Sequence, residues 1–169
     1  EGLWKCDWTT KPEDEVDDII THYSYSYATP VVILNEEGNI DKVVAAHDAG
    51  RIINPSLFAG QIEGAVHMGL GYAISEELEN EGCATKSTKL RKCGILMVKE
   101  TPDIEVIGIE FADPHGPFGA KGVGEAATNP CAAAYANALY NALGIRFTEL
   151  PIPAEQIVKA VKEREIGRA

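Results

Sequence analysis

Apolar and polar residues follow a two-residue period early in the chain. From Tyr23, aromatic residues alternate with small ones and lead into the apolar run 31–34, a pattern typical of a β-strand. The polar stretch 35–39 contains Gly38, which tolerates positive φ, so this stretch predicts a hairpin turn. The return strand is expected over residues 40–47, antiparallel to the first.

A helical period begins after Asn54. With Asn54 as the N-cap and Pro55 at the first helical position, the sequence predicts a helix over residues 55–77. The apolar stripe of this helix is expected to contain residues spaced four apart, namely Phe58, Ile62, Val66, Leu70 and Ile74.

The second half of the chain mixes loops, helices and short strands. Residues 78–94 are polar and predict a surface loop, and residues 113–124 are rich in glycine and proline and predict an ordered loop. The remaining expected elements are a strand over 104–111, a helix capped by Asn129-Pro130 that continues to Leu143 and ends at Gly144, a short strand over 145–150, and a last helix over 154–165 with Ile157, Val158 and Val161 facing inward.

These elements predict the α+β class, with antiparallel strands and packed helices in one domain over residues 22–165. The preceding residues 1–21 form an acidic lead-in with seven acidic residues and both tryptophans, Trp4 and Trp8. Across all 169 residues the net charge is −11, which opposes binding to a phosphate backbone and argues against a nucleic-acid partner. No apolar run reaches the roughly 18 residues of a membrane span, and without a signal peptide or lipidation motif we expect the cytoplasm.

The four cysteines, Cys6, Cys83, Cys93 and Cys131, contain no C-x-x-C pair. Their spacing fits neither a zinc site nor an iron–sulfur cluster held by this chain alone, and we expect them to be reduced and buried. The chain begins Glu-Gly-Leu without methionine, which leaves open that it is a processed product or a piece of a longer protein.

The predicted helix over 55–77 contains four glycines, Gly60, Gly64, Gly69 and Gly71. Each interior glycine destabilises a helix by about 1 kcal/mol relative to alanine, so a favourable interaction elsewhere must offset this cost. Close packing against a neighbouring element is the favoured explanation. The alternative is close approach of a cofactor, with Gln61 supplying the hydrogen-bonding side chain.

The second unusual segment is GPFGAKGVGE, residues 116–125. Its glycines allow backbone N–H groups to gather around a polar or anionic ligand, although the pattern matches neither the Walker A motif nor G-x-G-x-x-G. Glu125 has two interpretations. It is either an acid in the first turn of the following helix, stabilised by the helix dipole, or a carboxylate that accepts a proton in catalysis.

Other candidates are weaker. His47 and Asp48 are either a hydrogen-bonded pair or a structural histidine beside an acid. His67 and His115 have no partner at metal-ligand spacing, and the basic run Lys86, Lys89, Arg91 and Lys92 is expected to be a solvated loop.

Taken in order, several motifs resemble the large subunit of the molybdenum hydroxylases, the xanthine dehydrogenase and aldehyde oxidase family. They are HDAGRIINP (residues 47–55), GQIEG (60–64), GLGYA (69–73) and DPHGPFGAKGVGEA (113–126), followed by the stretches 132–143 and 149–155. The resemblance extends over residues 22–162, and the order and spacing of the motifs make it specific.

This resemblance implies a chemistry. In the family, the glutamate matching Glu125 is the general base that takes a proton from a molybdenum-bound hydroxyl while hydride passes to a sulfido ligand. The resemblance also implies that the cofactor-binding residues are Gln61, Ala120, Lys121, Gly122, Val123 and Gly124. The metal is held by the dithiolene of molybdopterin, so no protein ligand is expected, and the cytosine dinucleotide form of the pterin is one option. Iron–sulfur centres and FAD are expected only on other segments or subunits.

The family's large subunit is several times longer than this chain, which is therefore expected to be inactive alone. Its expected partners are the remainder of that subunit, the iron–sulfur and flavin subunits or domains, and a small-molecule substrate, with no membrane or nucleic acid; homo-oligomer formation stays open. The predicted function is that of an oxidoreductase segment acting on a purine, another N-heterocycle or an aldehyde. The alternative is a non-catalytic nucleotide- or pterin-binding or assembly module.

Overall fold

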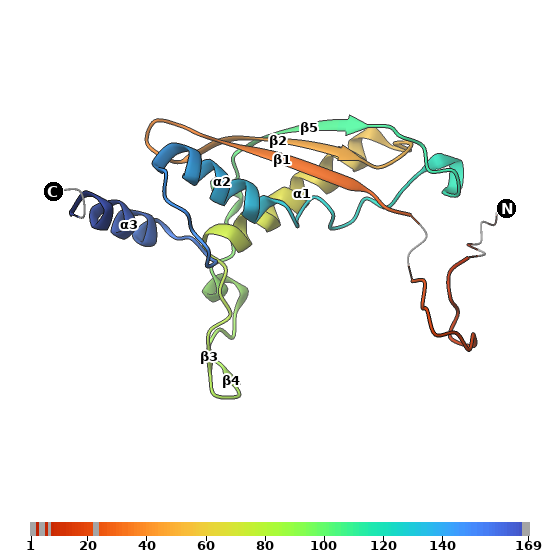
Figure 1. Cartoon of the computed structure of the whole chain (residues 1–169), viewed down its shortest axis with the longest axis horizontal. Coiled ribbons are helices and arrows are strands. Elements are labelled where there is room, and N and C mark those ends of the chain that lie inside the picture. The colour runs from red at the N-terminus through yellow and green to blue at the C-terminus, as the bar shows by residue number, and fades with distance from the viewer. Residues whose placement is uncertain (1–2, 4–5, 7, 22–23, 167–169) are drawn as a thin grey trace.

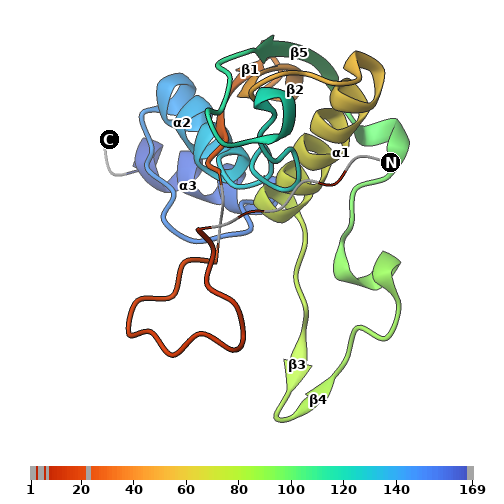
Figure 2. The ribbon, with the colours of Figure 1, turned by 90° about the vertical axis from the view of Figure 1, so that its right-hand side faces the viewer.

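In the computed structural model, which describes residues 3, 6, 8–21 and 24–166, a three-stranded sheet is covered on one face by two helices. The strand order is β1-β2-β5, and helices α1 and α2 lie side by side beneath it (Figures 1 and 2). A mixed fold of antiparallel strands with packed helices confirms the predicted class.

The first two strands form the predicted hairpin. β1 (Tyr27–Leu34) and β2 (Ile40–Asp48) pair antiparallel, with Val31 opposite Val44. The turn closes through hydrogen bonds between Asn35 and Asn39, and Gly38 takes a φ of +83° there. The predicted hairpin is therefore confirmed, although the aromatic start of the first strand at Tyr23 lies outside the described residues.

The third strand, β5 (Asp103–Ile109), pairs parallel with β2, so that Ala45 lies opposite Val106. Its bounds agree with the strand expected over 104–111 to within two residues. The parallel pairing, which the sequence pattern did not predict, requires a long crossover, and α1 together with the segment that follows it supplies one.

Helix α1 (Pro55–Ile74) starts as predicted, because the Asn54 side chain accepts a hydrogen bond from the Leu57 N–H over 3.0 Å. It ends at Ile74 rather than residue 77. Ser75 leaves the helix, and its hydroxyl donates to the Gly94 carbonyl over 2.6 Å. The four predicted stripe residues Phe58, Ile62, Val66 and Leu70 are buried, and Ile74 packs against the same core.

Residues 75–102 leave the end of α1, project away from the body and return to it (Figure 2). This excursion contains a two-residue hairpin, β3 (Asn80–Glu81) and β4 (Ala84–Thr85), within the predicted surface loop. The four basic residues Lys86, Lys89, Arg91 and Lys92 are exposed, as expected of a solvated loop.

Helix α2 (Cys131–Leu143) packs against β1 and α1 and ends at Gly144, whose φ is +65°. The expected end is confirmed, but the expected cap is wrong. Pro130 occupies the cap position and no side chain caps the helix, because residues 126–130 form a continuous turn ahead of it.

The strand expected over residues 145–150 is wrong. Arg146 donates to the Asn137 side chain over 3.1 Å and stacks on the Tyr140 ring at 4.0 Å, so this segment follows α2 instead of pairing with the sheet. Helix α3 (Ala154–Ile166) then follows as predicted, but only one of the expected inward residues packs on the core: Ile157 contacts it, whereas Val158 is 52% exposed.

The core lies between the sheet and helices α1 and α2. Its fully buried members include Val43, Ile62, Val66, Leu70 and Ile152. Residues 8–21 of the acidic lead-in contain neither helix nor strand and are almost wholly exposed. The Trp8 ring lies 4.6 Å from that of His115. Trp4 lies outside the described residues. None of the helices described could cross a membrane.

Candidate functional site

Backbone hydrogen bonds hold the first half of the glycine loop, residues 116–125. The Lys121 N–H donates to the Ala49 carbonyl over 2.8 Å, and the Arg51 N–H donates to the Gly119 carbonyl over 2.9 Å. Gly50 and Ala120 form an isolated antiparallel bridge between these two contacts. The loop is therefore attached to the residues that directly follow β2.

The predicted site residues line two separate hollows. Gln61, Ala120, Lys121 and Val123 line a hollow of about 340 Å³ at the start of α1, hereafter the Gln61 hollow. Gly122, Gly124 and Glu125 line another of about 600 Å³, hereafter the Glu125 hollow. Its remaining lining residues are Thr21, Ser24, Tyr25, Ser26, Ala126 and Asn129.

The two glycines of the Glu125 hollow face open space. A Cβ built on either Gly122 or Gly124 would meet no atom of the described residues within 4 Å. Among the described residues, no group accepts a hydrogen bond from the backbone N–H of residues 122, 123, 124 or 125. The N–H groups of Gly122, Gly124 and Glu125, which line this hollow, are thus without a partner in the described structure, and unpaired backbone donors of this kind bind anionic or polar groups in glycine-rich loops.

Glu125 is exposed, and its side chain takes part in no ion pair or hydrogen bond within the described residues. Helix α2 begins only at Cys131. The interpretation of Glu125 as an acid in the first turn of that helix is therefore wrong, because the turn over 126–130 separates the two. What remains is an unpaired carboxylate at the rim of a hollow.

Gln61 connects α1 to the same loop, since its side-chain Nε2 lies 3.4 Å from the Gly124 carbonyl oxygen.

The glycines of α1 agree only in part with the prediction that they pack closely against a neighbouring element. Gly60 and Gly64 are exposed, and a Cβ on either would meet nothing within 4 Å. Gly69 does pack closely, because a Cβ there would lie 2.6 Å from the Thr128 carbonyl oxygen.

His47 and Asp48 do not form a pair with each other. Asp48 instead pairs with Lys121, whose Nζ lies 2.5 Å from its Oδ2. His47 is 1% exposed, packs edge-on against Phe58, and neither ring nitrogen has a hydrogen-bond partner in the described structure. Burial lowers the pKa of His47, against the opposing influence of the Asp48 carboxylate and the Gly122 backbone.

The Asp48–Lys121 contact was not predicted from the sequence. Asp48 ends a buried strand, and Lys121 is the single cation in the glycine loop. A single lysine within a glycine-rich run, preceded along the chain by an acid at a strand end, is the signal that could have suggested this ion pair.

The remaining titratable candidates form no further site. Thr101 Oγ1 lies 2.9 Å from His67 Nδ1, and no cluster of three or more potential metal ligands occurs among the described residues. All four cysteines are free, but the prediction that they are buried holds for Cys131 alone, since Cys83 is exposed. Burial raises the pKa of the Cys131 thiol to about 11.

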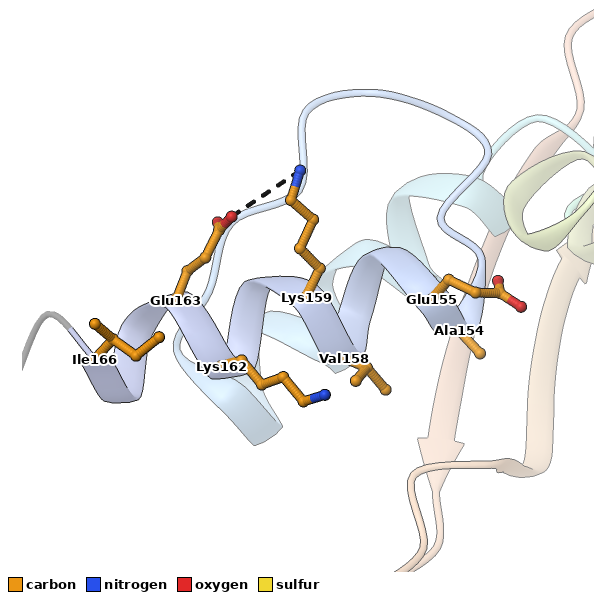
Figure 3. Close-up of a pocket in the computed structure, with 7 residues that line it drawn as sticks. All are labelled: Ala154, Glu155, Val158, Lys159, Lys162, Glu163 and Ile166. Atoms are coloured by element: carbon orange, nitrogen blue, oxygen red, sulfur yellow. Dashed lines mark ion pairs between the residues drawn. The ribbon is translucent and has the colours of Figure 1, made fainter.

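A groove of about 570 Å³ on the outward side of α3 is lined entirely by residues of that helix. Figure 3 shows Lys159 and Glu163 reaching toward each other there, with 4.0 Å between Nζ and Oε1. None of the predicted site residues lies in this groove. The chemistry-bearing residues therefore remain those of the two hollows beside the glycine loop.

A family model described as the molybdopterin cofactor-binding domain matches residues 1–102. The chain belongs to this family. The match contains the HDAGRIINP, GQIEG and GLGYA motifs and ends before the glycine loop.

Relatives extend the similarity of this molybdopterin-binding domain through the loop. A probable xanthine dehydrogenase component of Bacillus subtilis is 29% identical over 163 residues, which cover 94% of this chain and 22% of that protein. The aldehyde oxidoreductase of Megalodesulfovibrio gigas is 32% identical over 133 residues, 78% of this chain and 14% of that protein. These relatives are molybdenum hydroxylases, so the resemblance noted in the sequence is confirmed.

Solved structures agree. The aldehyde oxidoreductase from Desulfovibrio desulfuricans superposes with a TM-score of 0.66 at 37% identity, over 72% of this chain and 13% of that one. Quinoline 2-oxidoreductase from Pseudomonas putida superposes with a TM-score of 0.67 at 29% identity, over 74% of this chain and 16% of that one. The domain thus spans between about an eighth and about a fifth of the length of these relatives.

Proposed function

We propose that this molybdopterin-binding domain is the segment of a molybdenum hydroxylase that supplies the general base, Glu125, and part of the cofactor pocket. The observation that carries the proposal is the Glu125 hollow. It combines an unpaired carboxylate, the backbone N–H groups of Gly122, Gly124 and Glu125, which have no acceptor among the described residues, and space left by the described residues at the Cβ positions of the two glycines.

These features fit a bulky, polar and anionic cofactor. Larger side chains at Gly122 and Gly124 would fill the space beside the loop backbone that a cofactor would need. The N–H groups without acceptors suit phosphate or other oxygen acceptors. Gln61 would add a side-chain amide from α1. Lys121 would line the pocket without donating to the cofactor, because its ammonium group is paired with Asp48 and its N–H bonds to the Ala49 carbonyl.

When bound, molybdopterin supplies the metal-centred two-electron redox chemistry of the reaction. Glu125 would accept, at one of its carboxylate oxygens, the proton released as an oxygen nucleophile attacks the substrate. The Glu125 carboxylate is exposed and has no ion-pair or hydrogen-bond partner among the described residues, which leaves it accessible for this role. A general base of this kind typically contributes about 10²- to 10⁴-fold to the rate.

The proposed substrate is a purine, another N-heterocycle or an aldehyde. Relatives named for oxidising aldehydes, xanthine and nicotinate align with the domain, and a structural relative is named for quinoline. These compounds share an electron-poor carbon that a hydroxyl oxygen can attack.

The outer face of the sheet suggests where the rest of the subunit lies. Val31, Ile33, Ile107 and Ile109 are between 41% and 55% exposed on that uncovered face. Apolar side chains left exposed on one face of a sheet favour an interface with another protein segment. We propose that the remainder of the large subunit covers it, and that this remainder completes a site which the isolated domain cannot form.

Other parts of the assembly follow from the same assignment. Iron–sulfur and flavin subunits or domains would accept the electrons, and the cytosine dinucleotide form of the pterin stays one option. The division into a lead-in over residues 1–21 and a domain over 22–165, and the cytoplasmic location, stay predictions.

The test replaces Glu125 by glutamine in the complete enzyme and compares it with Glu149→Gln, which alters an exposed glutamate outside both hollows. Turnover and molybdenum content are measured on the same preparations. The proposal requires that Glu125→Gln alone lose turnover while both variants keep their molybdenum.

A further inference from the structure

The most deeply buried charges of the described residues form one ion pair. Lys121 Nζ lies 2.5 Å from Asp48 Oδ2, and the two side chains are only 5% and 11% exposed. Asp48 is the last residue of β2, whereas Lys121 belongs to the glycine loop, 73 residues later. The pair therefore joins the end of the central strand to the loop that bears Glu125.

Asp48 gathers several further groups around this contact. Its Oδ1 accepts hydrogen bonds from the Gly50 N–H over 2.8 Å and from the Phe111 N–H over 3.3 Å. The Lys121 ammonium also faces two aromatic rings, with 5.6 Å to the Tyr27 centroid and 5.1 Å to that of Phe111. The first residue of β1, the end of β2, the segment after β5 and the loop thus converge on one ion pair.

Lys121 is also the last residue of the loop that is fixed by a backbone donor. Its N–H bonds to Ala49, but no N–H of residues 122–125 finds an acceptor in the described structure. The next backbone hydrogen bond runs from the Thr128 N–H to the Glu125 carbonyl, within the turn that follows. Between Lys121 and Glu125, the loop is also contacted by the Gln61 amide, which lies 3.4 Å from the Gly124 carbonyl oxygen. The location of Lys121 therefore helps to set the path from the sheet to Glu125.

We propose that the Asp48–Lys121 pair is a positioning device that sets the location of Glu125 relative to the sheet. This inference rests on the proposed function, because it assigns the pair a role in the work of Glu125. Neither residue is assigned contact with the reacting atoms.

Energetics favour a positioning role over a purely stabilising one. Taking two charges out of water is costly, and apolar replacements of a buried ion pair often leave stability unchanged or improved. A directional, charged contact between strand and loop does, however, fix geometry. Burial alone would raise the pKa of Asp48, but the hydrogen bonds from Lys121, Gly50 and Phe111 and the lysine charge hold that pKa below its usual value, so the anchor stays charged at neutral pH.

The experiment uses the complete enzyme and the double variant Asp48→Asn/Lys121→Met. Asparagine keeps an oxygen acceptor for the Gly50 and Phe111 N–H groups, and removing both charges together avoids leaving one unpaired. The matched control, Lys42→Met/Glu105→Gln, removes an ion pair of 2.6 Å that involves the same strand but is partly exposed and outside both hollows. Lys121→Arg is the conservative variant.

Two quantities are measured: amide hydrogen exchange of peptides covering residues 49–52 and 119–121, and steady-state kinetics at known molybdenum content. We expect the double variant to speed exchange at least about tenfold and to lower kcat at least about tenfold, with KM and molybdenum content within about twofold of wild type. The control should change neither quantity, and Lys121→Arg should keep slow exchange and a kcat within about threefold of wild type.

Slow exchange or a wild-type kcat in the double variant would overturn the inference, and so would a molybdenum loss that accounts for the lost rate. If the double variant does not fold, the test rests on Lys121→Arg. Fast amide exchange in that variant, or a kcat at least about tenfold below wild type, would count against the proposed role of the Asp48–Lys121 pair. Failure of the general-base assignment is recognised separately, because Glu125→Gln would then retain full turnover whatever the exchange data show.

Discussion

Gln61 and Gly124 are 63 residues apart in the chain, yet the side-chain amide of Gln61 lies 3.4 Å from the Gly124 carbonyl oxygen. This contact links helix α1 to the free part of the glycine loop, just before Glu125. It explains how two motifs with no sequence proximity contribute to one region. The hollow on each side of the loop is bounded by residues that this contact holds together.

Gly122 and Gly124 offer a test of the open space above the loop. The Cβ of an alanine at either position would meet no atom of the described residues within 4 Å, so we expect the stability of the enzyme to stay within about 0.5 kcal/mol of wild type. A methyl group in a cofactor-binding surface should nevertheless reduce molybdenum content, and elemental analysis beside a thermal denaturation measures both. Full molybdenum loading in both variants would mean that the cofactor does not approach this backbone.

Two glycines of α1 should respond to alanine in opposite directions. Gly60 is exposed with nothing near its Cβ position, so Gly60→Ala should stabilise the fold by about 0.5–1 kcal/mol. Gly69→Ala would place its Cβ 2.6 Å from the Thr128 carbonyl and should destabilise by about 1–3 kcal/mol. Denaturant titrations give both values, and equal effects at the two positions would contradict the packing described for this helix.

The buried imidazole of His47 should make stability depend on pH. Because burial lowers its pKa, the folded state holds a neutral ring where the unfolded chain, with a pKa near 6.5, already binds a proton. Stability should therefore fall as the pH drops below about 6.5, by up to about 1 kcal/mol at a pH of about 5.5.

The comparison that isolates this effect uses His47→Gln, with His115→Gln as the control at an exposed imidazole. Unfolding is followed at several pH values between about 5.5 and about 7.5, a range that brackets the ordinary histidine pKa. We expect the pH dependence to be weaker in His47→Gln and unchanged in His115→Gln. Identical pH profiles for wild type and His47→Gln would contradict a buried neutral ring.

Elements defined by local signals could be predicted from the sequence. The hairpin at residues 35–39 and the start of α1 at Asn54-Pro55 depend on turn and cap chemistry within a few residues, and both are confirmed. The failures have tertiary causes. Helix α1 ends early because Ser75 bonds to Gly94, and the expected strand over 145–150 is absent because this segment follows α2.

The candidate site shows the same division. The order of the glycine motifs identified the region, but spacing alone could not separate Gly122 from Val123, which lie on different hollows. Asp48 and Lys121 are 73 residues apart, and their pairing depends on the parallel crossover that places β5 beside β2. Contacts of this kind follow from topology, which a local pattern does not contain.

The most direct test of the account is the single-turnover rate of cofactor reduction by substrate in Glu125→Gln, expressed per bound molybdenum. A single turnover excludes product release and reoxidation, so the rate reports the step that needs the base. Glutamine keeps the size and hydrogen bonding of glutamate but cannot accept the proton at neutral pH. We predict a rate at least about 10²-fold below wild type with molybdenum content near normal. A fully loaded variant that is reduced at the wild-type rate would show that Glu125 is not the base.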